Sequence, residues 1–169
     1  MHTTTSRPPV SLDLALGFGG PAALGLAMGL TGVSTSALLS ALTLPGAVLG
    51  TTLLMLPALY IGSALAGADT QARQMLRDAL GALREAGIGC LGLAPALLFL
   101  CATSGAGAGA LAVGLGLLFA AALGLRGFYA RLFDELQLGL AKGKAVLIFA
   151  AWALVALGIG ARMAAPAFG

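Results

Sequence analysis

The chain has 169 residues, of which 59% are hydrophobic and only 9% are charged, with a formal net charge of +3. A soluble domain carries about 25% charged residues, so this composition excludes a soluble globular protein and predicts one whose surface is covered by lipid. The nine basic residues are scattered and too few for nucleic-acid binding. The length fits a single domain, residues 1–169.

The first apolar run predicts a membrane span at about residues 14–33, since a span needs about 20 mainly apolar residues. The polar segment before it has one basic residue, Arg7, and no clear small-x-small site follows the run. We therefore expect a retained span and not a cleaved signal peptide. Gly25 and Gly29 are four apart, a spacing that permits close helix approach, which we expect to occur within the chain.

Residues 34–44 are uncharged and rich in Ser and Thr, which predicts a turn followed by an extra half-helix. The second span is expected at about residues 45–67. Pro45 suits the first turn of a helix, and Pro57 predicts a kink inside the span. We expect the span's hydroxyl groups to bond back to the helix or across to a neighbour. They are those of Thr51, Thr52 and Ser63.

The only long polar stretch in the first two thirds of the chain predicts an amphipathic helix at about residues 69–86. Asp69 is a good helix-starting residue, and Gly87 is a plausible end. Apolar residues recur at a spacing of three to four, so one face is apolar and the helix should lie in the membrane interface. It is a solvated connector, an anchor or a docking surface for a partner. The candidate docking residues are Met75, Leu76, Leu80 and Leu83.

The third span is expected at about residues 88–103, with Pro95 near its middle. It holds both cysteines of the chain, Cys90 and Cys101. Eleven residues put them on one helical face but ~16 Å apart along the axis, too far for a disulfide. We therefore expect two small packing residues.

A glycine-rich turn at residues 104–109 leads into the fourth span, at about residues 110–124. A second amphipathic helix follows at about residues 126–141, again with apolar residues at helical spacing. The fifth span is expected at about residues 145–161. The second helix adds four candidate docking residues: Phe128, Leu132, Phe133 and Leu136.

These elements predict an all-α, polytopic membrane bundle of about five transmembrane helices and two interfacial amphipathic helices. Five crossings place eight of the nine basic residues on one side of the membrane. The positive-inside rule makes that side the cytoplasm. We expect a bacterial cytoplasmic (inner) membrane protein with a cytoplasmic amino terminus and a periplasmic or extracellular carboxyl terminus.

The sequence offers no residue set for a reaction. His2 is its one histidine, and no Cys-x-x-Cys or zinc-ligand spacing occurs. No ionisable residue lies deep in the five apolar runs, which weighs against a proton-coupled pump or an ion channel. We expect no enzymatic activity, no cofactor and no metal.

Two stretches resemble a known family: RDALGALREAGIGCLGLAPALLFL, residues 77–100, and LGLRGFYARLFDELQLGLAKGKAVLIFAAWALV, residues 123–155. A charged link before a span with a central proline, Pro95, and a glycine–basic–alanine run at residues 139–145 are similar to the Yip-type (Rab-interacting) five-span membrane family, which has bacterial members. The resemblance implies a helical scaffold or trafficking-type membrane protein without catalytic residues. The acidic and glycine–proline motifs of the eukaryotic members are not apparent here.

The functional prediction is a non-enzymatic accessory or scaffold protein that organises a membrane complex or membrane shape. Its expected partners are membrane lipid and other membrane proteins or further copies of itself, with no nucleic acid. One alternative is a transport component for an apolar or lipid-like solute, with the kinked spans at Pro57 and Pro95 as moving parts. A second alternative is a small subunit of an energy-conserving membrane complex.

Overall fold

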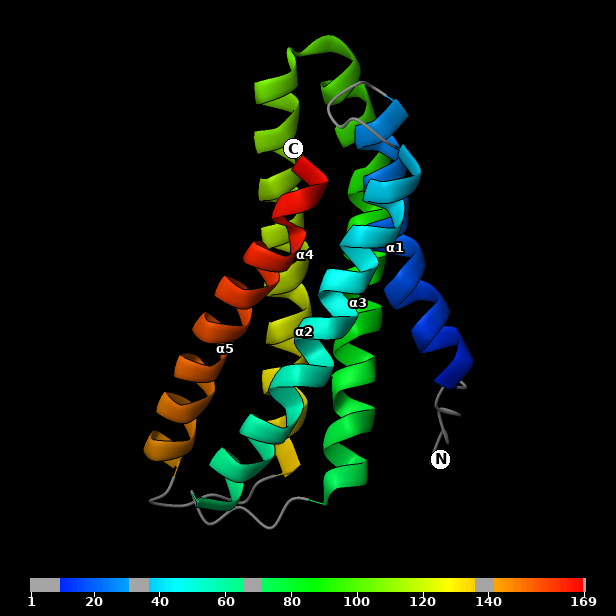
Figure 1. Cartoon of the computed structure of the whole chain (residues 1–169). Coiled ribbons are helices and arrows are strands. Elements are labelled where there is room, and N and C mark those ends of the chain that lie inside the picture. The colour runs from blue at the N-terminus through cyan, green and yellow to red at the C-terminus, as the bar shows by residue number, and fades with distance from the viewer. Residues whose placement is uncertain (1–9, 31–36, 66–70, 136–141, 169) are drawn as a thin grey trace.

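The computed structural model describes residues 10–30, 37–65, 71–135 and 142–168, and within these ranges all regular secondary structure is helical (Figure 1). Each of the five α-helices is long and apolar enough to cross a membrane, which confirms the prediction of an all-α chain with five such helices. The elements are α1 (Val10–Leu30), α2 (Ala37–Leu65), α3 (Ala72–Thr103), α4 (Ala106–Glu135), α5 (Lys142–Ala164) and a short 3-10 helix, η1 (Ala165–Phe168).

Successive helices run up and down the bundle (Figure 1). α3 lies between α1 and α4 and packs closely on both, while α2 packs on α1 and carries α5 on its other side. α5 hardly touches α4. The bundle is therefore tight around α1, α3 and α4 and looser where α5 joins it.

Glycines set the tight side of the bundle. A Cβ atom built on Gly20 would lie 2.7 Å from the Cα of Gly87, and one built on Gly25 would lie 2.7 Å from the Cα of Ala41. Real Cβ atoms do not come so close to a backbone atom, so α1 can approach α3 and α2 only through glycine. This confirms the expected close packing of Gly25 within the chain.

Each predicted amphipathic helix continues directly into a predicted span. α3 joins residues 72–86 to residues 88–103, and α4 joins residues 110–124 to residues 126–135. Two separate interfacial helices are thus not seen in the described residues. Gly87 does not end a helix, because α3 continues through it to Thr103. Its missing side chain instead allows α1 to lie close to α3. The predicted helix start at Asp69 and the last residues of the second helix, 136–141, lie outside the described residues.

The start of α2 also differs from the prediction. α2 begins at Ala37 and runs without a break through residues 37–44, so the expected half-helix is the first part of the same helix. Pro45 and Pro57 both lie inside α2. Pro45 is fully buried, and a membrane helix tolerates such a proline where neighbours satisfy the freed backbone groups.

Two apolar clusters form the core. The upper cluster includes Met28, Cys90 and Cys101, and both cysteines are free and buried. The prediction of two unbridged packing residues is confirmed, and the thiol of Cys101 donates a weak hydrogen bond to the carbonyl oxygen of Gly109 at 3.7 Å. The lower cluster consists of Leu59, Met75, Ala79, Phe128, Leu132 and Phe149.

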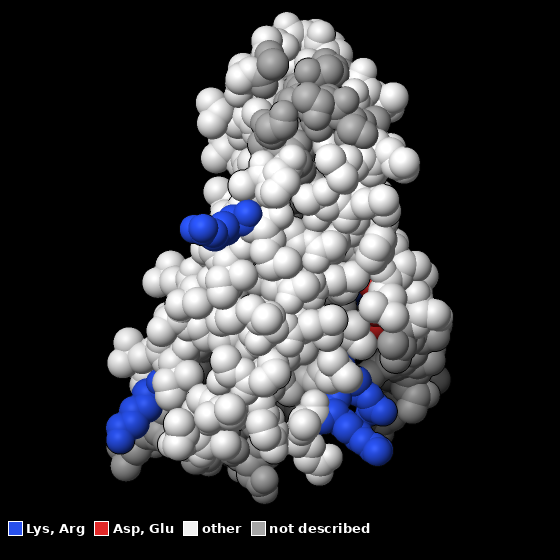
Figure 2. Space-filling model, viewed as in Figure 1, with Lys and Arg blue, Asp and Glu red and all other residues white. Residues whose placement is uncertain are grey.

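The described charges gather toward one end of the bundle. α3 and α5 begin there and α4 ends there, so Arg73, Arg77, Arg131 and Lys144 all lie toward the lower end (Figure 1). Figure 2 shows Lys and Arg mainly over the lower half of this face, with one cationic side chain higher up. Above that side chain, this face shows no charged residue wherever it is described.

Candidate functional site: an apolar cavity beside α5

A cavity of about 470 Å³ lies where α5 diverges from α4. Its volume falls within the range of small-molecule sites, about 300–1,000 Å³. Four helices supply its walls. They contribute Leu44, Ala47, Val48, Thr51, Thr52 and Leu56 from α2; Ala79, Ala82, Leu83 and Ala86 from α3; Ala110, Leu111, Gly114, Leu115, Leu117, Leu118, Ala121, Gly124, Leu125 and Phe128 from α4; and Trp152, Ala156, Leu157, Gly160, Ala161 and Ala164 from α5.

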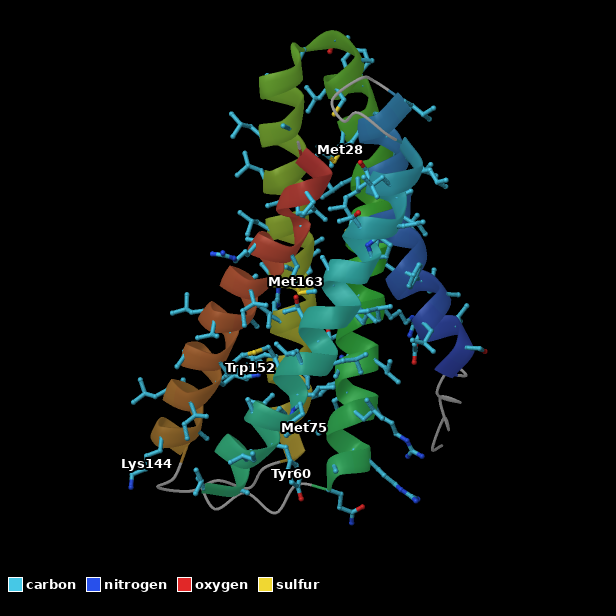
Figure 3. The ribbon with its side chains drawn as sticks, viewed as in Figure 1. Met28, Tyr60, Met75, Lys144, Trp152 and Met163 are labelled. Atoms are coloured by element: carbon cyan, nitrogen blue, oxygen red, sulfur yellow. The ribbon has the colours of Figure 1, made fainter. Side chains whose placement is uncertain are left out.

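The cavity lies beside α5 because α5 packs mainly on α2 and meets α4 closely only at the aromatic residues of its lower part. The indole Nε1 of Trp152 donates a 2.7 Å hydrogen bond to the carbonyl oxygen of Met55, and Thr51 Oγ1 donates a weak 3.6 Å hydrogen bond to Met163 Sδ. Trp152 and Met163 both lie between α5 and α2 (Figure 3). At Gly62 a Cβ atom would lie 2.8 Å from Ile148 Cγ2, so a glycine on α2 lets α5 lie close.

An aromatic cluster closes the lower end of the cavity. The ring centroid of Phe128 lies 5.9 Å from that of Phe149 and 5.8 Å from that of Trp152, and Tyr129 meets Phe149 edge-on at 5.4 Å. These separations are those of favourable tilted and edge-to-face aromatic pairs. The cluster joins α4 to α5 at this level, and the cavity lies above it.

The cavity walls are almost wholly apolar. No Asp, Glu, Lys, Arg or His is among the lining residues, and the hydroxyl groups there are those of Thr51 and Thr52. Both hydroxyls already donate hydrogen bonds, to Met163 Sδ and to the carbonyl oxygen of Val48. The predicted bonding of the hydroxyls of α2 is confirmed, as Ser63 Oγ also donates to the carbonyl oxygen of Tyr60. The walls therefore suit hydrocarbon and offer no ionisable side chain to pair with an ion.

The mouth of the cavity opens on the outer surface of the bundle. Leu111, Leu115 and Leu118 line the cavity, yet they are 71%, 66% and 53% exposed. The part of the lining that α5 supplies includes small residues such as Gly160. An apolar molecule beside the bundle can reach the cavity without crossing a polar surface.

The predicted docking residues lie in and around this site. Met75, Leu83, Phe128 and Leu132 are buried, and Leu83 and Phe128 line the cavity. These four side chains pack against neighbouring helices of the same chain and are not exposed on its surface. Leu80 is half-buried and Leu76 is 46% exposed. The side chains of Phe133 and Leu136 lie outside the described residues.

Ion pairs join the polar ends of the helices, and the periodicity of the sequence did not predict them. Arg131 of α4 pairs with Glu85 of α3, and Arg84 of α3 lies 3.7 Å from Asp13 of α1. At Gly81 a Cβ atom would lie 2.9 Å from Arg131 Nη1, so this glycine makes room for the guanidinium group. Glu85 and Arg131 are 46 residues apart in the sequence. Local periodicity cannot relate residues so far apart, so this pair becomes visible only in the folded structure.

No cluster of three or more potential metal-ligating side chains occurs among the residues that the structure describes. The predicted absence of a cofactor and of catalysis stays a prediction.

Five helices that are long and apolar enough to cross a membrane indicate a multi-pass α-helical membrane protein. No protein-family model, no curated protein and no solved structure matches the chain. The resemblance to the Yip-type family therefore stays a prediction.

Proposed function

We propose that the protein binds an apolar or lipid-like molecule inside the bilayer, as the binding unit of a membrane transport component. The observation that carries the proposal is the apolar cavity of about 470 Å³ whose lining includes the exposed leucines of α4. A bundle that served only as a scaffold would need no such space. Close packing is the normal state of a protein interior.

The cavity differs from the one that the transport alternative anticipated. The sequence placed the moving parts at Pro57 and Pro95, and neither residue lines the cavity. The site instead lies beside α5, which packs on α2 but makes few contacts with α4. The binding unit is thus α2, α4 and α5, supported by α3.

The charge distribution supports an orientation for this binding unit. The basic ends of α3, α4 and α5 lie together, as expected for the cytoplasmic side. In this proposal the aromatic end of the cavity faces the cytoplasmic leaflet, and the end of α5 at Ala164 faces the other leaflet. A bacterial inner membrane remains the expected location.

The scaffold hypothesis has less support in the fold. Four of its eight docking residues are buried within the chain, so a partner would have to use the outer faces of α3 and α4. Leu76 is the described docking residue best placed for that role.

The test fills the cavity with a side chain. A Cβ atom on Gly114 meets nothing within 4 Å, and Gly114 lines the cavity. Gly114→Leu should therefore fold. Leucine is also a better helix former than glycine, whose helix propensity is ~0.8–1.0 kcal/mol less favourable than that of alanine in soluble hosts. Gly158→Leu is the matched control, because Gly158 also has open space around it and is exposed on α5 outside the cavity.

The measurement is native mass spectrometry of the protein released from membranes in a gentle detergent. We expect the unchanged protein and Gly158→Leu to keep a bound lipid-like molecule. Gly114→Leu should retain it about tenfold less, because forcing a ligand into an overfilled site costs ~1–3 kcal/mol. Equal retention by both variants, or no bound molecule in any of them, would overturn the proposal.

A further inference from the structure

We infer that the cavity takes one acyl chain of a bilayer phospholipid, lengthwise, with its terminal methyl group against Phe128 and Trp152, and that these two side chains set the longest chain the site accepts. This inference rests on the proposed function and adds the ligand class, its direction and the residues that select it.

The shape of the cavity fits a chain better than a compact molecule. Its lining on α5 runs from Trp152 to Ala164, which is ~18 Å at the ~1.5 Å rise per residue of an α-helix. Its lining on α4 runs from Ala110 to Phe128, or ~27 Å by the same rise. One leaflet of hydrocarbon is about half of the ~30 Å core. The α5 wall is thus a little longer than one leaflet and the α4 wall is nearly as long as two, so the cavity is elongated and its modest volume is spread along a length that suits an extended acyl chain.

The two ends of the cavity differ, which gives the chain a direction. At the lower end Phe128 is 2% exposed and packs against Trp152, so the rings close the cavity. At the upper end the lining includes the small side chains of Ala110 and Ala164, and α5 gives way to η1. The carboxyl terminus lies below the hairpin of α3 and α4 (Figure 1). A head group would therefore lie outside the cavity, beyond its upper end, and the methyl end of the chain would lie against the rings.

The chemistry of the walls favours a ligand recognised by its chain. Thr51 and Thr52 donate their hydroxyl protons to atoms of the protein, and no ionisable side chain lines the cavity. A charged head group buried among these walls would lose its hydration without a partner. The head group must therefore stay outside the cavity, as it does when a phospholipid inserts one tail through a lateral mouth.

The mouth faces the hydrocarbon that supplies such a tail. Leu111, Leu115 and Leu118 belong both to the cavity and to the exposed apolar surface. A phospholipid in the adjacent leaflet can move one chain past these leucines without leaving the bilayer. A free fatty acid would bring a carboxylate to the same apolar rim, and we take it as the competing source.

The test uses phosphatidylcholine vesicles whose lipid carries a photoreactive diazirine either at the terminal carbon of one chain or close to its ester group. After illumination, mass spectrometry of the digested protein locates the label. We expect the terminal probe to label the stretch around Leu125 and Phe128 and the ester-proximal probe to label the stretch from Ala110 to Leu115. Labelling should fall about tenfold in Gly114→Leu and stay unchanged in Gly158→Leu.

A second arm tests the length limit with probes of increasing chain length. Trp152→Leu removes the larger part of the floor, and we expect the best-labelling chain to become longer. Phe149→Leu is the matched control, because Phe149 belongs to the same aromatic cluster but does not line the cavity. It should leave the preferred chain length unchanged.

The outcomes separate this inference from the proposed function. Cavity labelling that does not depend on the diazirine position, or an equal shift in Trp152→Leu and Phe149→Leu, overturns the lengthwise insertion and leaves a lipid-binding cavity. Labelling by a photoreactive free fatty acid but not by the phospholipid overturns the phospholipid assignment. No labelling of the cavity walls by any probe overturns both proposals.

Discussion

Alanine at Gly87 should destabilise the bundle, whereas alanine at Gly92 on the same helix should not. A Cβ atom on Gly87 would lie 2.9 Å from the Cα of Gly17 and closer still to the carbonyl group of Leu16. All of these are backbone atoms of α1, so no side-chain rotation relieves the contact. A Cβ atom on Gly92 meets nothing within 4 Å.

The magnitude follows from two opposing effects. Overpacking costs ~1–3 kcal/mol, and the upper half of that range applies because both partners are helix backbones. Replacing glycine by alanine inside a helix recovers ~0.5–1 kcal/mol. We therefore expect Gly87→Ala to lower the free energy of unfolding by ~1–2 kcal/mol, and Gly92→Ala to leave it unchanged or raise it by up to ~1 kcal/mol.

The assay is a reversible unfolding titration in mixed micelles, with the helix signal read by circular dichroism. Opposite signs for the two variants support the close approach of α1 and α3. Equal changes in stability would refute the reasoning, because the two substitutions are chemically identical and differ only in what lies next to the new methyl group.

Three further predictions concern the ion pair, the lower cluster and the cysteines. Charge removal at Glu85 and Arg131, singly and together, should give a coupling energy of only ~0.2–1 kcal/mol in a double-mutant cycle, because both side chains are about a third exposed; a larger coupling would mean a more deeply buried pair. Phe128→Ala should cost ~3–5 kcal/mol in an unfolding titration, as for other fully buried aromatic residues, and a loss below ~1 kcal/mol would place its ring outside the core. Cys90 and Cys101 are buried and free, so a maleimide should leave both unmodified in the folded protein and modify both after denaturation; rapid labelling of the folded protein would contradict their burial.

The number of apolar helices long enough to cross a membrane was predictable because it depends on composition and length, whereas the two separate amphipathic helices were not found in the described residues. Five apolar runs give five helices, two of which reach their full length only by joining a polar segment, and the break at Ser104 and Gly105 follows from local residue chemistry. The role of Gly87 was not predictable, since a glycine after a polar stretch has the same local signature whether it ends a helix or admits a neighbouring one. Only the position of α1 distinguishes the two cases.

The candidate site could be predicted only in its parts. The sequence singled out Leu83 and Phe128 as apolar residues at helical spacing, and both line the cavity. The sequence pattern assigned Leu83 and Phe128 to a docking surface for a partner. Periodicity shows which face of a helix is apolar, but it does not show which other part of the chain covers that face. The cavity itself results from α5 packing on α2 through Trp152 and Gly62, a pairing of distant segments that no local pattern records.

The most direct measurement is an experimental structure of the unaltered protein in a lipid nanodisc, at a resolution that shows bound lipid chains. The account predicts elongated density in the cavity, running from the level of Ala164 down to Trp152, with the head group outside the upper end. A bundle in which α5 packs against α4 along its whole length, leaving no space between them, would contradict it.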